Sequence, residues 1–274
     1  MNKFIKSLIY MFLIPISLLG QTNEGYPELK KYSNFGFTFG GALFANPKIV
    51  PITGQYTLKP IPIPSYSFGI SINIPIKFPW SIETGIFMLH EPSIFAKLNL
   101  PNEELVGLGS SDFEYEAKQY IMYTVSLPLL LKYHIKTTDK SFFNFQMGLK
   151  VMYLISNFAE EEVIVFDTDT SGYTLLSIYT ESPEENFIGS FFYGIGYSYA
   201  LKNCLITTSL NHIVNFQNTN NGYYGITNLV NSSDSYGKYN LSGNYFSLNL
   251  NFQFLSKKYR KEQKLQRKKT EIQI

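Results

Sequence analysis

The chain of 274 residues has few of the residue types on which many enzyme and metal sites depend. It contains one cysteine, Cys204, and three histidines. A single cysteine excludes an internal disulfide, so the stability of an exported chain must come from packing. His90, His134 and His212 fall on different predicted strands, and no HExxH, CxxC or phosphate-loop pattern is present. We therefore expect no catalytic residue, no metal site and no cofactor.

The sequence also lacks an apolar run long enough to cross a bilayer as a helix, which needs about 20 residues. Its most apolar stretch, Leu8 to Leu19, is shorter, follows Lys3 and Lys6, and ends at Gly20 before a polar segment. This pattern is typical of a cleaved export signal. We predict a signal peptide over residues 1–20, a periplasmic leader over 21–33, an outer-membrane barrel over 34–255 and a basic tail over 256–274.

Aromatic residues and glycine are abundant, with 23 Phe, 21 Tyr and 19 Gly. From Gln119 to Phe158, apolar residues occupy every second position in two long runs joined by a short turn. A period of two places alternate residues on opposite faces of a strand, so each run has an apolar and a mainly polar face. The runs exceed the ~5–6 residues of most soluble strands. This length favours lipid, and not a soluble core, as the neighbour of the apolar face.

The same alternation predicts eight strands along the chain. They cover residues 35–43, 66–78, 81–90, 120–135, 143–155, 190–201, 204–216 and 246–254. Short turns alternate with long polar connections, among them 91–117 and 159–186. Outer-membrane barrels have short periplasmic turns and long external loops. The predicted fold is therefore all-β: an eight-stranded antiparallel transmembrane up-and-down β-barrel in the cell outer membrane.

Charged residues inside such a barrel are candidates for a functional site. Glu83, Lys132 and Lys150 lie on the polar, inward faces of their predicted strands. A charge in a narrow lumen must be paired or hydrated. We predict an interior ion pair of Glu83 with Lys132 or Lys150. Because eight strands enclose a space that side chains can fill, we do not expect general diffusion through the lumen.

The C-terminal segment is strongly basic although the whole chain has a formal net charge of only +2. Its eight basic residues are Lys257, Lys258, Arg260, Lys261, Lys264, Arg267, Lys268 and Lys269. We predict that this tail lies in the periplasm, where it can bind lipid headgroups or an envelope protein. A solvated tail without a partner is an equally open interpretation. Nucleic acid is excluded as a partner in that compartment.

Three segments resemble the PorT-like outer-membrane β-barrel domain family. They are the run from Tyr123 to Tyr133 with Pro128 inside it, the run from Phe142 to Gly148, and Ile82 to Met88. The resemblance implies an outer-membrane location and no enzymatic activity. Some members of the family are similar to accessory components of type IX secretion, which implies a possible role of that kind here.

The sequence thus favours an integral outer-membrane protein with a structural or protein-interaction role. We expect a monomeric barrel whose partners are outer-membrane lipid and envelope or secretion-complex proteins. The alternative is a narrow pore or small-solute transporter. A third hypothesis is an enzyme acting on lipid or peptide at an outer loop, using Ser110, Ser111, Asp112 and His90.

Overall fold

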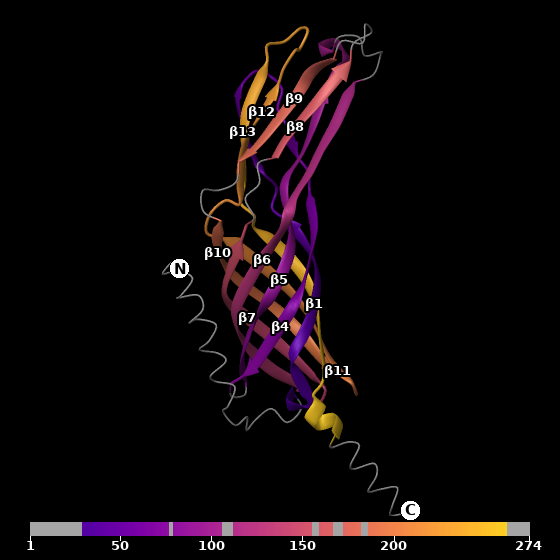
Figure 1. The fold of residues 1–274 in the computed structure, drawn as a ribbon, viewed down its shortest axis with the longest axis vertical. Coiled ribbons are helices and arrows are strands. Elements are labelled where there is room, and N and C mark those ends of the chain that lie inside the picture. Colours follow the sequence, from indigo (N-terminus) through magenta and orange to yellow (C-terminus); the bar gives the residue numbers. More distant parts are fainter. Residues whose placement is uncertain are drawn as a thin grey trace, which may run out of the picture.

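Eight strands close into one antiparallel barrel (Figure 1). The computed structural model describes residues 29–76, 79–105, 112–154, 159–166, 172–181 and 186–261. The barrel strands are β1 (Tyr32–Phe44), β4 (Ile63–Pro75), β5 (Trp80–Leu100), β6 (Phe113–Thr138), β7 (Ser141–Tyr153), β10 (Phe187–Ala200), β11 (Cys204–Asn215) and β14 (Tyr245–Leu255). Each pairs with the next in this order, and β14 pairs with β1 to close the ring. The predicted all-β, eight-stranded antiparallel barrel is confirmed.

Alternation along each strand decides which side chains face outward. On β1, the rings of Phe35, Phe37 and Phe39 are exposed on the outer surface, whereas Thr38 between them is buried. On β10, Tyr197 is exposed and its neighbour Ser198 is buried. The barrel therefore has an apolar exterior and a polar interior, the reverse of a soluble protein. No helix in the described part of the chain is long and apolar enough to cross a membrane.

Both described ends of the chain lie at the same end of the barrel (Figure 1). A short 3₁₀ turn, η2 (Leu29–Lys31), precedes β1, and a helical turn at 257–261 follows β14. The backbone N–H of Ser256 donates to the Lys31 carbonyl at 2.9 Å, which joins the two ends. The connections β4–β5, β6–β7 and β10–β11 are short, as predicted.

The opposite end carries a second sheet, which the sequence analysis did not predict. Its order is β2 (Lys48–Thr53), β13 (Ser235–Leu241), β12 (Asn220–Ile226), β9 (Gly172–Glu181) and β8 (Ala159–Phe166). Strands β5 and β6 also continue beyond the barrel and stay paired to Leu100 and Phe113, and β3 (Lys59–Pro60) adds to β5. The prediction of 91–117 and 159–186 as long polar connections was therefore wrong, because most of their described residues form strands.

These additional strands enclose a hydrophobic core of their own. We call the five-stranded sheet, β3 and the extensions of β5 and β6 the sandwich. The extensions contribute Ile94, Leu98 and Leu100 to its core, and the facing sheet contributes Leu176, Ile178, Tyr224, Ile226 and Tyr239, all nearly or fully buried. Two layers with alternate residues packed between them are the usual architecture of a soluble β-sandwich. The molecule thus combines a lipid-facing barrel with a sandwich built like a soluble domain.

Two cross-strand pairs of glycine and tyrosine join β12 to β13 on the core face of the sheet. Gly222 lies opposite Tyr239, and Tyr224 lies opposite Gly237. A methyl group added to either glycine would collide with the ring of the facing tyrosine. Each ring therefore lies over the glycine of the neighbouring strand, an arrangement that protects backbone hydrogen bonds and holds the register.

Candidate functional site

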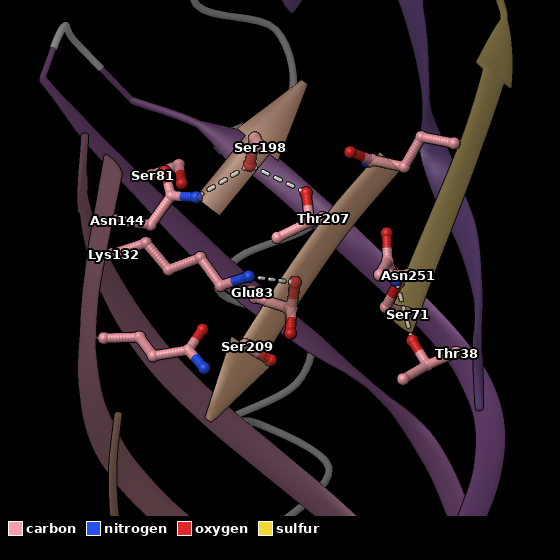
Figure 2. A network of polar contacts seen from close by, with 12 residues as sticks. Thr38, Ser71, Ser81, Glu83, Lys132, Asn144, Ser198, Thr207, Ser209 and Asn251 are labelled. Carbon is pink, nitrogen blue, oxygen red and sulfur yellow. Dashed lines mark hydrogen bonds and ion pairs between the residues drawn. The ribbon is translucent and has the colours of Figure 1, made fainter. Parts of the chain in front are cut away.

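The barrel lumen contains a network of hydrogen-bonded polar side chains from different strands (Figure 2). Asn144 on β7 donates from Nδ2 to the hydroxyl of Ser198 on β10 at 2.7 Å, and that hydroxyl lies 2.8 Å from Thr207 Oγ1 on β11. Across the lumen, Asn251 on β14 donates to Thr38 Oγ1 on β1 at 2.7 Å. These bonds connect neighbouring strands in addition to the backbone ladder.

The ion pair of the lumen joins Lys132 on β6 to Glu83 on β5, with Nζ 2.5 Å from Oε2 (Figure 2). The two side chains are only 8% and 14% exposed. Lys150, also buried, donates instead to the hydroxyl of Tyr245 at 2.6 Å and lies 4.8 Å from the centre of that ring. All three charged residues named from the sequence thus face the lumen, while what they do for the protein stays a prediction.

His134 belongs to the same network. Its Nε2 lies 2.7 Å from the hydroxyl of Ser81, and its Nδ1 contacts Asn144 Oδ1. Because both ring nitrogens are engaged, this histidine has a structural position. The described residues include no group of three or more His, Cys, Asp and Glu side chains that could hold a metal ion.

The lumen is almost filled. A cavity of about 50 Å³ lies among the polar side chains, bordered by Glu83, Lys132, Gln146 and Lys150. One water molecule occupies at least ~10–15 Å³ of such space, so this cavity has room for a few waters. It is too small for a sugar or an amino acid. Among the described residues, the polar side chains leave only this small cavity beside the Lys132–Glu83 pair.

The outer face of the five-stranded sheet presents a row of exposed side chains far from the lumen. Cross-strand register places Lys238 opposite both Val50 and Tyr223, and Tyr223 opposite Tyr179. Tyr179, Tyr223 and Tyr236 are 39%, 45% and 46% exposed. The Lys238 ammonium lies 5.2 Å from the centre of the Tyr223 ring. We call these residues, with Ile52, the tyrosine face.

Glu104 organises the tip of the sandwich, farthest from the barrel. It ends the 3₁₀ turn η3 (Asn102–Glu104) and is 4% exposed. Its carboxylate accepts hydrogen bonds from the Ser232 hydroxyl, the Asn231 backbone N–H at 3.0 Å and the Tyr56 hydroxyl at 3.0 Å. The Ser232 hydroxyl, followed by these other donors, holds the pKa of Glu104 below its usual value against the opposing effect of burial. One carboxylate thus ties together three loops.

The structure separates His90 from Asp112, the two described residues of the hypothetical loop-sited enzyme. His90 lies at the rim of the barrel, where its ring stacks on Tyr120 with centres 4.1 Å apart. Asp112 lies at the tip of the sandwich and accepts from the Asn102 backbone N–H at 3.2 Å. The height of His90 and the height of Asp112 differ by ten residues of strand β5, which is about 30 Å at the rise of an extended strand. Ser110 and Ser111 lie outside the described residues.

The predicted basic tail is described only at its beginning. Lys257, Lys258, Arg260 and Lys261 are exposed on the helical turn that follows β14. Tyr259 between them packs against the cluster of Tyr32 and Leu255 at the barrel end. Arg267, Lys268 and Lys269 lie outside the described residues, as do Lys264, the predicted signal peptide and most of the predicted leader.

A closed antiparallel barrel with an apolar exterior and a polar, filled interior defines an integral membrane β-barrel. Residues 20–231 match the family model described as "Outer membrane protein beta-barrel domain". The match covers most of the chain, so this protein belongs to that family and is a protein of the outer membrane. No curated protein sequence matches the chain.

Several solved structures are similar in fold. The outer membrane protein OprG from Pseudomonas aeruginosa shares 8% identity, covers 82% of this chain and 98% of its own, and gives a TM-score of 0.39. Neisserial surface protein A shares 11% identity, covers 81% of this chain and 99% of its own, and gives a TM-score of 0.33. The outer membrane protease OmpT from Escherichia coli shares 9% identity, covers 81% of this chain and 98% of its own, and gives a TM-score of 0.32. Likeness at this level carries nothing about function.

Proposed function

We propose that this outer-membrane protein is a non-enzymatic interaction protein that displays the sandwich at the cell surface for binding another protein. Outer-membrane barrels keep short turns on the periplasmic side, which assigns the sandwich to the exterior. The tyrosine face is the observation that supports this function best. Exposed tyrosines grouped with aliphatic residues are typical of protein interfaces, since tyrosine offers a large contact area at low entropic cost.

The state of the lumen weighs against the alternative of a narrow pore or small-solute transporter. The cavity of about 50 Å³ has room for a few water molecules at most, and the Lys132–Glu83 pair borders it. We expect purified protein in planar lipid bilayers to show no conductance steps above background. Regular steps that disappear in a Glu83→Ala variant would instead support the pore.

The interaction itself is best tested by cross-linking from the tyrosine face. A photo-reactive amino acid at Tyr223 should capture a protein partner in intact cells, because this side chain is 45% exposed in the middle of the face. The matched control is the same amino acid at Tyr197, which is 46% exposed on the lipid-facing barrel surface. Capture that occurs equally at both positions, or at neither, would contradict the proposal.

A narrower proposal concerns the periplasmic side and rests on the PorT-like resemblance. In this version the protein is an accessory of type IX secretion, and the basic tail contacts the secretion complex. The exposed start of the tail at the barrel end supports its access to the periplasm. A pull-down from gently solubilised membranes, with and without residues 257–274, tests it. Loss of secretion components upon truncation would support the role, whereas recovery of the barrel alone from both forms would oppose it.

A further inference from the structure

A groove crosses the lipid-facing surface of the barrel. Its volume is about 630 Å³, and it is lined by residues of β5, β6, β7, β10, β11 and β14. These six strands follow one another in the barrel wall. Neighbouring strands lie ~4.8 Å apart, so a path across all six is about 24 Å long. Half of the hydrocarbon core of a bilayer is about 15 Å thick, so the groove is long enough for one extended acyl chain.

Two adjacent rows of outward-facing side chains form the walls of the groove. Across β7, β10 and β11, one row consists of Met147, Tyr193 and His212, and the other of Phe145, Ile195 and Leu210. All of them are exposed except His212, which is partly exposed. Successive outward residues of a strand lie about 7 Å apart, so the two rows leave a channel as wide as a single hydrocarbon chain.

His212 is a polar group fixed in this apolar wall. Its Nδ1 lies 2.5 Å from the Tyr193 hydroxyl, and its ring stacks on Phe246 with centres 4.1 Å apart. Its Nε2 forms no hydrogen bond to any residue that the structure describes. A polar group without a partner is costly in hydrocarbon. A lipid atom that can accept a hydrogen bond is the partner that this surface makes available.

The two ends of the groove lie near opposite faces of the bilayer. His212 lies three residues before the end of β11 at Asn215, on the side of the barrel next to the sandwich. Trp80, at the other end, begins β5 and packs edge-on against Tyr133 with ring centres 4.8 Å apart. Aromatic side chains of this kind mark the membrane–water interfaces of a barrel. The groove therefore runs obliquely from one interface toward the other.

We propose that the groove binds one phospholipid of the leaflet next to the sandwich, with an acyl chain between the two rows and the phosphate at His212. The groove is continuous with the surface that contacts the bilayer, so membrane lipid is its natural occupant. When the Tyr193 hydroxyl donates to Nδ1, the neutral imidazole carries its proton on Nε2 and donates it to the lipid. A phosphate oxygen is preferred to an ester oxygen, because a charged acceptor forms the stronger bond.

The test is a titration of the full chain in detergent micelles with dioleoyl phosphatidylglycerol, followed by native mass spectrometry. We expect the wild type to acquire one tightly held phospholipid at low lipid concentration. His212→Phe keeps a ring against Phe246 but removes the donor. It should raise the concentration for half-occupancy about fivefold, the effect of one lost hydrogen bond. Tyr193→Phe should act in the same direction, because it releases the His212 ring.

A matched pair of variants separates the groove from the rest of the lipid-facing surface. Met147→Ala lowers one wall at a side chain that is 57% exposed, and it should weaken binding. Phe39→Ala removes a ring that is 56% exposed on β1, outside the groove, and it should bind as the wild type does. All of these side chains face lipid, so the packing of the barrel interior is preserved. Equal occupancy of the wild type, His212→Phe and Met147→Ala would overturn the proposal.

Labelling in vesicles gives a second readout that does not depend on extraction into detergent. Phosphatidylglycerol with a photo-reactive diazirine in its acyl chain should label β7 and β10 more than β1, and His212→Phe should reduce the difference. Diacylglycerol with the same chain lacks the phosphate, so its labelling should not depend on His212. Equal labelling of β1 and β10 by the phospholipid would refute a groove site. The same dependence on His212 for both lipids would refute the assignment of the phosphate.

Discussion

Lys132 and Glu83 are diagonal neighbours across the β5–β6 ladder: Glu83 lies opposite Leu130, and Lys132 follows two residues later on the same face. This register, and not simple opposition, brings Nζ to 2.5 Å from Oε2. The two side chains are only 8% and 14% exposed, so the barrel shields the pair from bulk solvent. Removal of one partner should therefore matter more than removal of both.

Lys132→Met is expected to destabilise the barrel by about 3 kcal/mol, because it leaves the Glu83 charge unpaired in the lumen. The double variant with Glu83→Gln should lose less than the sum of the two single variants. Urea unfolding in micelles measures both. Lys136→Met is the control, because its ion pair with Asp139 is exposed to solvent and should contribute little to stability. Additive single and double effects would contradict a coupled pair.

Gly237→Ala is expected to destabilise the sandwich by about 1–3 kcal/mol through a collision with the Tyr224 ring. The barrel should stay folded, since these residues lie outside it. Limited proteolysis should cut the sandwich faster while the heat-resistant barrel fragment remains. Gly41→Ala provides a control, because an added methyl group there meets no neighbouring atom. Equal behaviour of the two variants would show that the tyrosine rings move aside freely.

Glu104 should make the tip of the sandwich sensitive to acid. Its pKa is lowered in the folded protein, mainly by the Ser232 hydroxyl, so its carboxylate stabilises the fold at neutral pH. That contribution is complete above the unfolded pKa of about 4.3 and is lost as the pH falls through the lower folded value. We expect hydrogen exchange in residues 227–235 to accelerate in this acid range, after correction for the intrinsic rate.

Glu104→Gln should show the faster exchange already at neutral pH, because its NH₂ replaces one carboxylate oxygen and cannot accept the bonds made there, either that of Asn231 to Oε2 or those of Ser232 and Tyr56 to Oε1. Its difference from the wild type should shrink in acid. The neighbouring Glu103 is exposed and uses only its backbone carbonyl, which accepts from Asn231. Glu103→Gln should therefore behave as the wild type, and a similar effect of both substitutions would refute a specific role for Glu104.

The sequence by itself determined the barrel, because a period-two pattern separates two faces whatever the strand pairs with. The exposed Phe37 and buried Thr38 of β1 follow directly from it. The same signal was present in Phe113 to Tyr120, but the charged residues Glu114, Glu116 and Lys118 on the open face made this strand resemble a polar loop. The sandwich was missed for that reason.

Only the tertiary structure decided which residues meet. Glu104 and Ser232, like Pro92 and Asn220, are far apart in the chain, and neither pair forms a motif of fixed spacing. Lys132 is the partner of Glu83 because its strand β6 pairs with β5, whereas Lys150 lies one strand further on β7. A register shift of one residue would turn Lys132 to the outer face. Local alternation fixes the face of a side chain, whereas its partner is set by closure of the barrel and folding of the sandwich.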